Sequence, residues 1–351
     1  MLIDKKHKLI CILSIVLILI PILSACKKIK SEPVAKTELL LGTVCTIKIY
    51  DKPEDKVFEA AFTRIKNLEN KLTINKSGSE VDSINDAAGI KPITVSKDTY
   101  YCIKEGFKYS ALSSGKYDIT VGPLVKSWGI GTDNARVPNL SEIDSDKALI
   151  NYKDVVLDDT NMTVMLKRKG MLIDLGGIAK GFVADEVEKV LTSNGVSHAI
   201  INLGGNVLTL NNNINGNPWL IGVQNPFSEE RGTSIGTLNV SGESITTAGI
   251  YERYFEVSGK KYHHILDIKT GYPAENELAG VTVLTGKSID GDGIDTAILL
   301  MGLKEGLKFI TNTKGMEAIF VTRTKEIYIT PGLKQNFKLT DNGFVLKKSS
   351  Q

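Results

Sequence analysis

MLIDLGGIAKGFVADEVEKVL, residues 171–191, is the stretch that determines most about the fold. Residues 171–175 are almost wholly apolar and predict a short strand. In residues 181–191, valines and a leucine recur at helical spacing on one face, which predicts a helix. The glycine-rich turn between them, residues 174–181, offers backbone N–H groups and a helix N-terminus, both of which suit a phosphate.

Asp174 and Lys180 lie on this glycine-rich turn. A glycine turn before a helix is most often only a connection, and the spacing here matches neither a Walker loop nor a dinucleotide-binding fingerprint. A carboxylate and a cation on one short loop are, however, what a pyrophosphate with its metal ion requires. We therefore interpret the turn as a candidate nucleotide site.

Strands and helices are predicted on both sides of this stretch. Helical spacing of apolar residues predicts helices at 57–72 and 99–111, and a further helix follows a second glycine-rich turn around 292–303. Alternation within 39–50 predicts a strand that begins at Gly42-Thr43, and further strands are predicted at 162–166, 198–203, 206–210, 219–223 and 235–240. Residues 117–125 are expected to be extended, and residues 128–160 to form a long surface excursion. Neither a repeat nor a composition break divides the chain, so we expect one α+β unit.

The composition excludes several classes of protein. Of the 351 residues, 42% are hydrophobic and 24% are charged, which is typical of a soluble domain and excludes disorder and multiple membrane spans. The formal net charge is only +3, and the excess lies in Lys5, Lys6 and Lys8 at the start of the chain. We therefore expect no nucleic-acid partner.

The first 25 residues resemble a secretory signal, with a basic head at 5–8 and an uncharged run at 9–25. Small residues precede Cys26, as in bacterial lipoprotein signals. We expect cleavage before Cys26, lipidation of Cys26, a tether at 26–37 and a catalytic domain at 38–345. The domain would then be lipid-anchored on the extracytoplasmic face of the bacterial cell membrane. An uncleaved membrane anchor is the alternative.

Two further cysteines, Cys45 and Cys102, would remain in the mature chain. They are too few for a disulfide scaffold, and no Cys/His spacing indicates a zinc site. A single bridge between them is left open, because sequence alone cannot decide it.

A second candidate site lies in SIDGDGIDTA, residues 288–297. Asp295 and Thr296 follow Asp292 by three and four residues, so in a helix all three would share one face. Oxygen ligands of this kind favour Mg²⁺ over a transition metal. Capping of a helix N-terminus is the alternative interpretation.

A third segment, residues 251–273, contains the pair His263-His264. Adjacent residues on a strand point to opposite faces, so only one of the two can face a given site. We expect a core or hydrogen-bonding role for the other.

These segments occur in order with LGT (41–43), YDITVGPLV (117–125) and INLGGN (201–206). Together they resemble the ApbE-type FAD:protein FMN transferases, or flavin transferases, over about residues 38–340. The resemblance implies a single T-fold-like catalytic unit of mixed and antiparallel sheets packed with helices. It also implies a Mg²⁺-dependent attack by a Thr or Ser hydroxyl of an acceptor protein on the FMN-side phosphorus of FAD. AMP would leave, and FMN would remain attached as a phosphoester.

The resemblance implies a role for individual residues and for a partner. Mg²⁺ would be held by Gly177, through backbone oxygen, and by Asp292, Asp295 and Thr296. FAD would be lined by Leu41, Asn75, Lys116, Tyr117, Asp118, Asp174, Lys180 and Ile265. His264 would activate the acceptor hydroxyl or steady the phosphate. The acceptor is expected in a membrane or extracellular electron-transfer system.

Two departures from the family pattern keep alternatives open. Ala248 stands where relatives often have Ser, and Asn75 falls where many carry an aromatic residue that could stack on the flavin nucleotide. Losing such a stacking face costs about 1 kcal/mol. A FAD pyrophosphatase that releases FMN and AMP, and a non-catalytic flavin-binding lipoprotein, are therefore alternatives. The retained Asp292, Asp295 and Thr296 argue against the second, because binding alone does not require a metal site.

Overall fold

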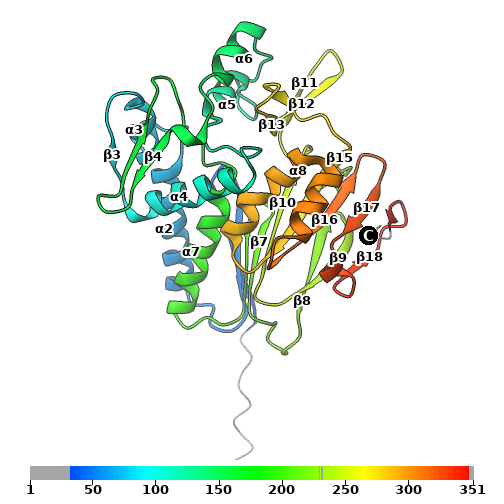
Figure 1. The fold of residues 1–351 in the computed structure, drawn as a ribbon. Coiled ribbons are helices and arrows are strands. Elements are labelled where there is room, and N and C mark those ends of the chain that lie inside the picture. The colour runs from blue at the N-terminus through cyan, green and yellow to red at the C-terminus, as the bar shows by residue number, and fades with distance from the viewer. Residues whose placement is uncertain (1–31, 229, 231, 348–351) are drawn as a thin grey trace, which may run out of the picture. The chain divides into compact units, whose positions relative to one another are not determined.

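The structure is a computed structural model that describes residues 32–228, 230 and 232–347. Within these residues a nine-stranded sheet forms the centre, in the order β1-β2-β6-β7-β10-β15-β16-β17-β19 (Figure 1). Its strands are β1 (Val34–Leu40), β2 (Thr43–Ile49), β6 (Ala199–Leu203), β7 (Asn206–Leu210), β10 (Ser244–Gly249), β15 (Leu278–Thr285), β16 (Met316–Thr322), β17 (Glu326–Ile329) and β19 (Val345–Leu346). Neighbouring strands are antiparallel except β17 and β19. The predicted α+β class with mixed and antiparallel sheets is confirmed.

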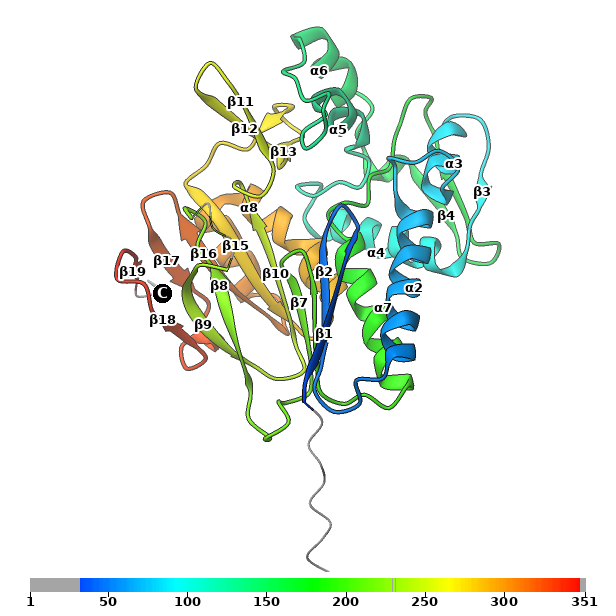
Figure 2. The same cartoon turned by 180° about the vertical axis from the view of Figure 1, so that it is seen from behind.

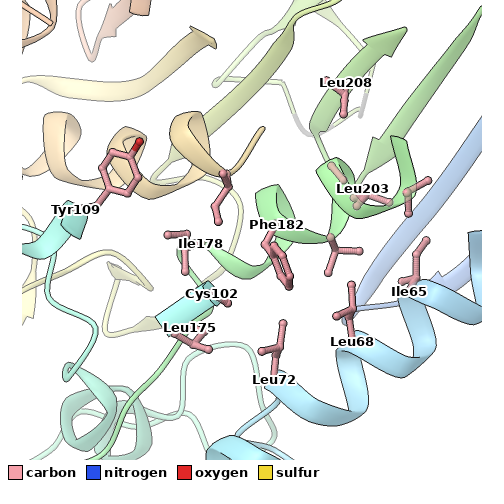
Figure 3. Close-up of a cluster of buried hydrophobic side chains, with 14 of the residues drawn as sticks. Ile65, Leu68, Leu72, Cys102, Tyr109, Leu175, Ile178, Phe182, Leu203 and Leu208 are labelled. Atoms are coloured by element: carbon pink, nitrogen blue, oxygen red, sulfur yellow. The ribbon is translucent and has the colours of Figure 1, made fainter. Parts of the chain in front are cut away.

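Long helices cover one face of this sheet (Figure 1). They are α2 (Asp55–Leu72), α7 (Ala179–Ser193) and α8 (Ser288–Thr311), with α4 (Lys97–Leu112) beside them. Figure 3 shows Ile65 and Leu68 of α2 facing Phe182 of α7, with Leu203 of β6 nearby. All four side chains are buried, and burial of each stabilises the fold by about 1.5–3 kcal/mol. None of the helices in the described part of the chain has the length and apolar character of a membrane span.

A three-stranded sheet covers part of the opposite face, as the view from behind shows (Figure 2). It consists of β8 (Trp219–Gln224), β9 (Ser234–Val240) and β18 (Phe337–Leu339), and the short η2 (Pro331–Leu333) precedes β18. A second apolar core lies here and includes Leu238 of β9, Ile245 of β10 and Ile319 of β16. Because the middle strands are covered on both faces, every residue of β15 is buried.

Smaller elements complete the unit. They are α3 (Glu80–Asp86), α5 (Gly122–Trp128), α6 (Leu140–Lys147), η1 (Tyr152–Asp154), the sheet of β3 (Ile93–Thr94), β5 (Thr163–Leu166) and β4 (Val155–Asp158), and the hairpins β11 (Tyr254–Val257)–β12 (Lys260–His263) and β13 (Leu266–Asp267)–β14 (Tyr272–Pro273). A third apolar core around Trp128 joins α5 and α6 to these two hairpins. The Trp128 indole N–H also donates a hydrogen bond to the Gly271 carbonyl at 2.8 Å.

Most predicted elements are confirmed, including α2, α4, α7 and strands β2, β5, β6, β7, β8 and β9. The tether was predicted at residues 26–37, but residues 34–37 belong to β1. The predicted signal at 1–25 and Cys26 lie outside the described residues. Cys45 and Cys102 are both buried free thiols, so they do not form the bridge that was left open.

Three predicted segments were wrong. Residues 117–125 are not extended throughout, because α5 begins at Gly122 with Pro123 in its first turn. The excursion at 128–160 contains α6, η1 and β4. Residues 171–175 form no strand and touch Val121 through one isolated bridge at Leu172.

Candidate active site

The segment before the glycine-rich turn is fixed by one buried side chain rather than by a sheet. The Asn85 side-chain amide donates to the Ile173 carbonyl at 3.0 Å, and the Ile173 N–H donates to Asn85 Oδ1 at 2.7 Å. The next N–H, of Asp174, donates to the Ile119 carbonyl at 2.8 Å. These bonds hold the chain extended up to the turn. The Asp174 carboxylate then accepts from the Gly176 N–H at 2.7 Å.

Asp292 of α8 links the turn to the second predicted cluster. One carboxylate oxygen accepts from Lys180 Nζ at 2.9 Å, and the other accepts from the Gly181 N–H at 2.9 Å. Asp292 is 2% exposed, whereas the Lys180 side chain is 30% exposed. The N-terminus of α7 and the first turns of α8 therefore place a lysine and a carboxylate side by side. The sequence predicts each residue as a candidate but does not predict their contact.

Close contact of α7 and α8 depends on glycine. A Cβ atom at Gly181 would lie 2.4 Å from the Ser288 carbonyl oxygen, which is far too close. A Cβ atom at Gly293 would lie 2.6 Å from the Tyr109 ring of α4. The glycines of the second cluster were expected in a turn before the helix. Gly291 and Gly293 instead lie inside α8, where the lack of a side chain permits close packing.

Asp295 is the second carboxylate of the cluster and is 3% exposed. Burial, and then the negative charge of Asp292, raises its pKa to about 8, although Lys180 opposes this. The Thr296 N–H and hydroxyl donate to Asp295 Oδ1 at 2.5 and 3.2 Å. Asp292, Asp295 and Thr296 thus lie together as the sequence predicts. Two neighbouring carboxylates that repel each other form a site for a cation.

The residues present fit a hard cation such as Mg²⁺. The described residues contain no cluster of three or more His, Cys, Asp and Glu side chains suited to a metal. A metal here would therefore depend on two carboxylates, the Thr296 hydroxyl and backbone oxygen, which is an all-oxygen set. Gly177 packs against Tyr117, since a Cβ atom at Gly177 would lie 2.8 Å from the Tyr117 ring, and the charge of Asp292 contributes to raising the pKa of Tyr117.

Tyr117 offers a buried polar atom to a ligand. Burial, and then nearby negative groups that include Asp292 and Asp174, raises its pKa well above the ordinary value. Its hydroxyl has no hydrogen-bond partner within the described part of the chain. A buried hydroxyl without a partner is costly, so this atom suits a bound polar group.

The other predicted FAD residues are placed differently. The Asp118 carboxylate already accepts from the Thr120 N–H and hydroxyl and from the Tyr152 N–H, so it holds the loop. Lys116 is half-buried beside it. Leu41 lies in the two-residue β1–β2 turn with φ 55°, and Asn75 lies on an exposed bend after α2. The described contacts do not join Asn75 to the carboxylate cluster.

The two histidines have different surroundings. His263 is buried, and its Nε2 lies 3.0 Å from the Ala274 carbonyl. The His264 N–H donates to the Arg253 carbonyl at 3.1 Å, and His264 Nδ1 lies 3.3 Å from the same oxygen. A carbonyl can only accept, so this contact places the His264 proton on Nδ1 and leaves Nε2 as an acceptor. Burial, and then the charge of Arg253, lowers the pKa of His264 to about 4. His264 is followed by Ile265, which is buried.

A cavity of ≈ 2030 Å³ adjoins the His264 segment without including the carboxylate cluster. Its walls are β8, β10, the β6–β7 turn at Gly204 and Gly205, and residues from 250–277. His263 and Ala274 line it, so it reaches the segment that carries His264 and Ile265. No sequence pattern indicates this cavity or the role of Asn85, because both depend on contacts between distant segments.

Comparison with known proteins shows which family this chain is similar to. The model of the ApbE family matches residues 41–320. A FAD:protein FMN transferase of Klebsiella pneumoniae (strain 342) is 39% identical over 306 residues, which cover 87% of this chain and 94% of that protein. One of Treponema pallidum (strain Nichols) is 29% identical over 331 residues, which cover 90% of this chain and 91% of that protein.

Solved structures show the same fold. The ApbE protein of Thermotoga maritima is similar with a TM-score of 0.79 and 31% identity, over 86% of this chain and 98% of that one. The flavin transferase ApbE of Vibrio cholerae is similar with a TM-score of 0.78 and 26% identity, over 87% of this chain and 99% of that one.

Proposed function

The chain belongs to the ApbE family, and from this membership we propose that it is a FAD:protein FMN transferase acting on a Thr or Ser hydroxyl of an acceptor protein. The observation that supports this most is the junction of α7 and α8. There Lys180, bound to Asp292 at 2.9 Å, lies beside a second buried carboxylate, Asp295. Such a set suits a pyrophosphate and its cation.

In the proposed reaction the oxygen of the acceptor hydroxyl forms a bond to the FMN-side phosphorus of FAD. The bond from that phosphorus to the bridging oxygen breaks, and AMP leaves with the electron pair. Phosphoryl transfer of this kind needs positioning and charge neutralisation more than covalent help from the protein. Bound Mg²⁺, held by Asp292, Asp295, Thr296 and the Gly177 backbone, would supply charge neutralisation at the pyrophosphate.

The chain's own residues would bind the phosphate and accept the proton of the attacking hydroxyl. Lys180 is held by Asp292 with part of its side chain exposed, so it can bind a phosphate oxygen. His264 is uncharged at neutral pH because its pKa is lowered to about 4 by burial and by Arg253. Its Nε2 is the free acceptor and would take the proton of the acceptor hydroxyl. The Tyr117 hydroxyl would donate to the nucleotide.

The test is mass spectrometry of an acceptor protein incubated with residues 27–351, FAD and Mg²⁺, with free nucleotides measured in the same tube. The proposal expects a gain of one FMN on a Thr or Ser and an equal amount of AMP. Omitting Mg²⁺ should prevent both. Absence of any adduct on every acceptor tried from membrane or extracellular electron-transfer systems would contradict the transferase.

A FAD pyrophosphatase is the second candidate, favoured by the exposed position of Asn75. An aromatic side chain there could cover the flavin nucleotide, whereas Asn leaves it open to water. The same tube decides between the two, because hydrolysis gives free FMN and AMP without an adduct. In that case Asn75→Tyr should reduce hydrolysis.

We also propose that the protein is anchored through a lipid on Cys26 outside the cytoplasm. The support is the basic, apolar and small-residue pattern that precedes Cys26. Metabolic labelling with a fatty acid should mark the full chain and should not mark Cys26→Ser. Labelling of both would contradict the assignment.

A further inference from the structure

Arg253 lies between two turns that come from different parts of the chain. A Cβ atom at Gly131, after α5, would lie 3.3 Å from Arg253 Cδ. A Cβ atom at Gly42, in the β1–β2 turn, would lie 3.7 Å from Arg253 Nη2. Both glycines have positive φ angles, 88° and 66°. The side chain therefore crosses from one turn to the other with its guanidinium next to the turn that holds Leu41.

The same guanidinium lies within electrostatic range of Asp174 and Lys180 on the α7 turn. Burial raises the pKa of Asp174, and the charge of Arg253 acts in the opposite direction. Arg253 also acts on Lys180 and on His264. The charged groups of Asp174, Lys180 and Arg253 thus act on one another, with the His264 imidazole beside them. Asp174 and Lys180 belong to the α7 turn, whereas Arg253 and His264 stand before and after the β11–β12 hairpin.

The residues around Lys180 carry little positive charge that is free to bind an anionic ligand. Lys180 is bound to Asp292, and Asp174 and Asp295 add two further carboxyl groups. With these carboxylates ionised, the two negative charges of the FAD pyrophosphate bring the site to more negative charge than one divalent cation and one lysine can neutralise. Arg253 is exposed, so its guanidinium can reach a ligand. Its planar fork also matches the geometry of phosphate oxygens.

The Arg253 backbone is fixed by the hairpin that follows it. Its carbonyl accepts from the His264 N–H at 3.1 Å. Phe255 and Tyr262 stack across the hairpin with ring centroids 5.4 Å apart, and Trp128 contacts both rings. The third apolar core thereby fixes the position of the Arg253 backbone.

We propose that Arg253 binds the pyrophosphate of FAD and stabilises the phosphate of AMP as it leaves. This rests on the proposed function. As the acceptor oxygen bonds to the FMN-side phosphorus, the bridging oxygen leaves with the electron pair, and negative charge grows on the AMP phosphate. The guanidinium donates hydrogen bonds to non-bridging oxygens there, and these bonds strengthen as that charge grows.

The test compares FAD with riboflavin, which has the same ring system and no phosphate. Binding of each to the apo protein is measured by flavin fluorescence without acceptor, for wild type, Arg253→Gln, Arg253→Lys and Arg136→Gln. The last is the control, because Arg136 is an exposed arginine paired with Glu142. Loss of a charge-assisted hydrogen bond should weaken FAD binding of Arg253→Gln by about 10- to 100-fold.

Riboflavin binding should stay within about twofold in all four proteins, and Arg253→Lys should lie between wild type and Arg253→Gln for FAD. Unchanged FAD affinity in Arg253→Gln would overturn the proposal. An equal loss for riboflavin would also overturn it, since the residue would then support the flavin pocket rather than the phosphates. Far-ultraviolet circular dichroism and melting temperature confirm that each variant is folded.

A single-turnover arm separates this proposal from the proposed function. With saturating FAD and an acceptor, Arg253→Gln should transfer FMN at least about tenfold more slowly than wild type, beyond its binding defect. If wild type binds FAD and never forms the adduct, the transferase fails while the binding comparison still decides the role of Arg253. If wild type forms the adduct and Arg253→Gln matches it in both binding and rate, only the role of Arg253 fails.

Discussion

Replacing Asp185 with Asn should change how stability depends on pH. Asp185 lies on α7 and is 9% exposed. Its carboxylate accepts from the Ser288 N–H at 2.7 Å and the Ile289 N–H at 3.0 Å, the first two N–H groups of α8. Asp185 therefore holds the start of the helix that carries Asp292 and Asp295.

The magnitude follows from the pKa of Asp185, which burial raises to about 6 from an ordinary 3.8 despite the two N–H donors. Between these values the unfolded chain has lost the proton while the folded chain keeps it. The free energy of unfolding therefore falls as pH rises from about 4 to about 6. Above about pH 6 the contribution of Asp185 no longer changes with pH. A shift of about two pKa units corresponds to about 3 kcal/mol. Asp185→Asn has no such titration.

The assay is urea denaturation at pH 4, 5, 6 and 7 for wild type and Asp185→Asn. The difference in unfolding free energy, Asp185→Asn minus wild type, should grow by about 3 kcal/mol from pH 4 to pH 7. Asp98→Asn is a control of opposite sign. The bidentate bond from Arg64 holds the pKa of Asp98 well below its usual range, so its contribution is lost only as pH falls below about 4. A difference for Asp185→Asn that stays flat from pH 4 to 7 would refute the reasoning and show that the helix N-terminus fully offsets burial.

Three further predictions concern the junction of α7 and α8. Asp295→Ala should reduce FMN transfer at least about 100-fold while FAD affinity changes little, because the cation site and not the nucleotide pocket is lost; wild-type turnover would contradict this. Lys180→Ala should weaken FAD binding about tenfold in equilibrium titration, as expected for one lost phosphate contact, and an unchanged dissociation constant would count against that contact. Gly181→Ala should lower the unfolding free energy by about 1–3 kcal/mol in urea, because its Cβ would lie 2.4 Å from the Ser288 carbonyl oxygen; Gly286→Ala, where a Cβ would have nothing within 4 Å, is the matched control.

Periodicity predicts the long elements of this fold because their apolar faces are regular. The valines of 181–191 identify α7, and the alternation at 235–240 identifies β9. Periodicity fails where a contact with a distant residue determines the backbone conformation. Residues 171–175 are apolar enough for a strand, yet Asn85 and Ile119 take the backbone bonds that a neighbouring strand would have taken at residues 173 and 174.

The site shows the same division. Residue type and spacing predict that Asp292, Asp295 and Thr296 share a face, since this follows from one helix alone. They do not predict that Lys180 meets Asp292, because the two residues are 112 positions apart and their pairing depends on the close packing of two helices at Gly181. The sequence does not predict the position of Arg253 for the same reason, since its neighbours come from the distant turns at Gly42 and Gly131.

The two groups of site residues differ in what fixes them, and this has a consequence for the reaction. Asp292 and Lys180 lie on helices packed against the large sheet, and the hydrogen bond between them needs no ligand. Arg253 and His264 flank a hairpin fixed by the separate core around Trp128, and the His264 contacts with the Arg253 carbonyl keep the two together. Under the proposed function we therefore expect the nucleotide to bridge these groups, with the carboxylates and Lys180 on one side and the Arg253 guanidinium and His264 imidazole on the other. A nucleotide that lacks the pyrophosphate would engage only part of this set, so under the proposed function we expect FAD to engage both groups of residues at once.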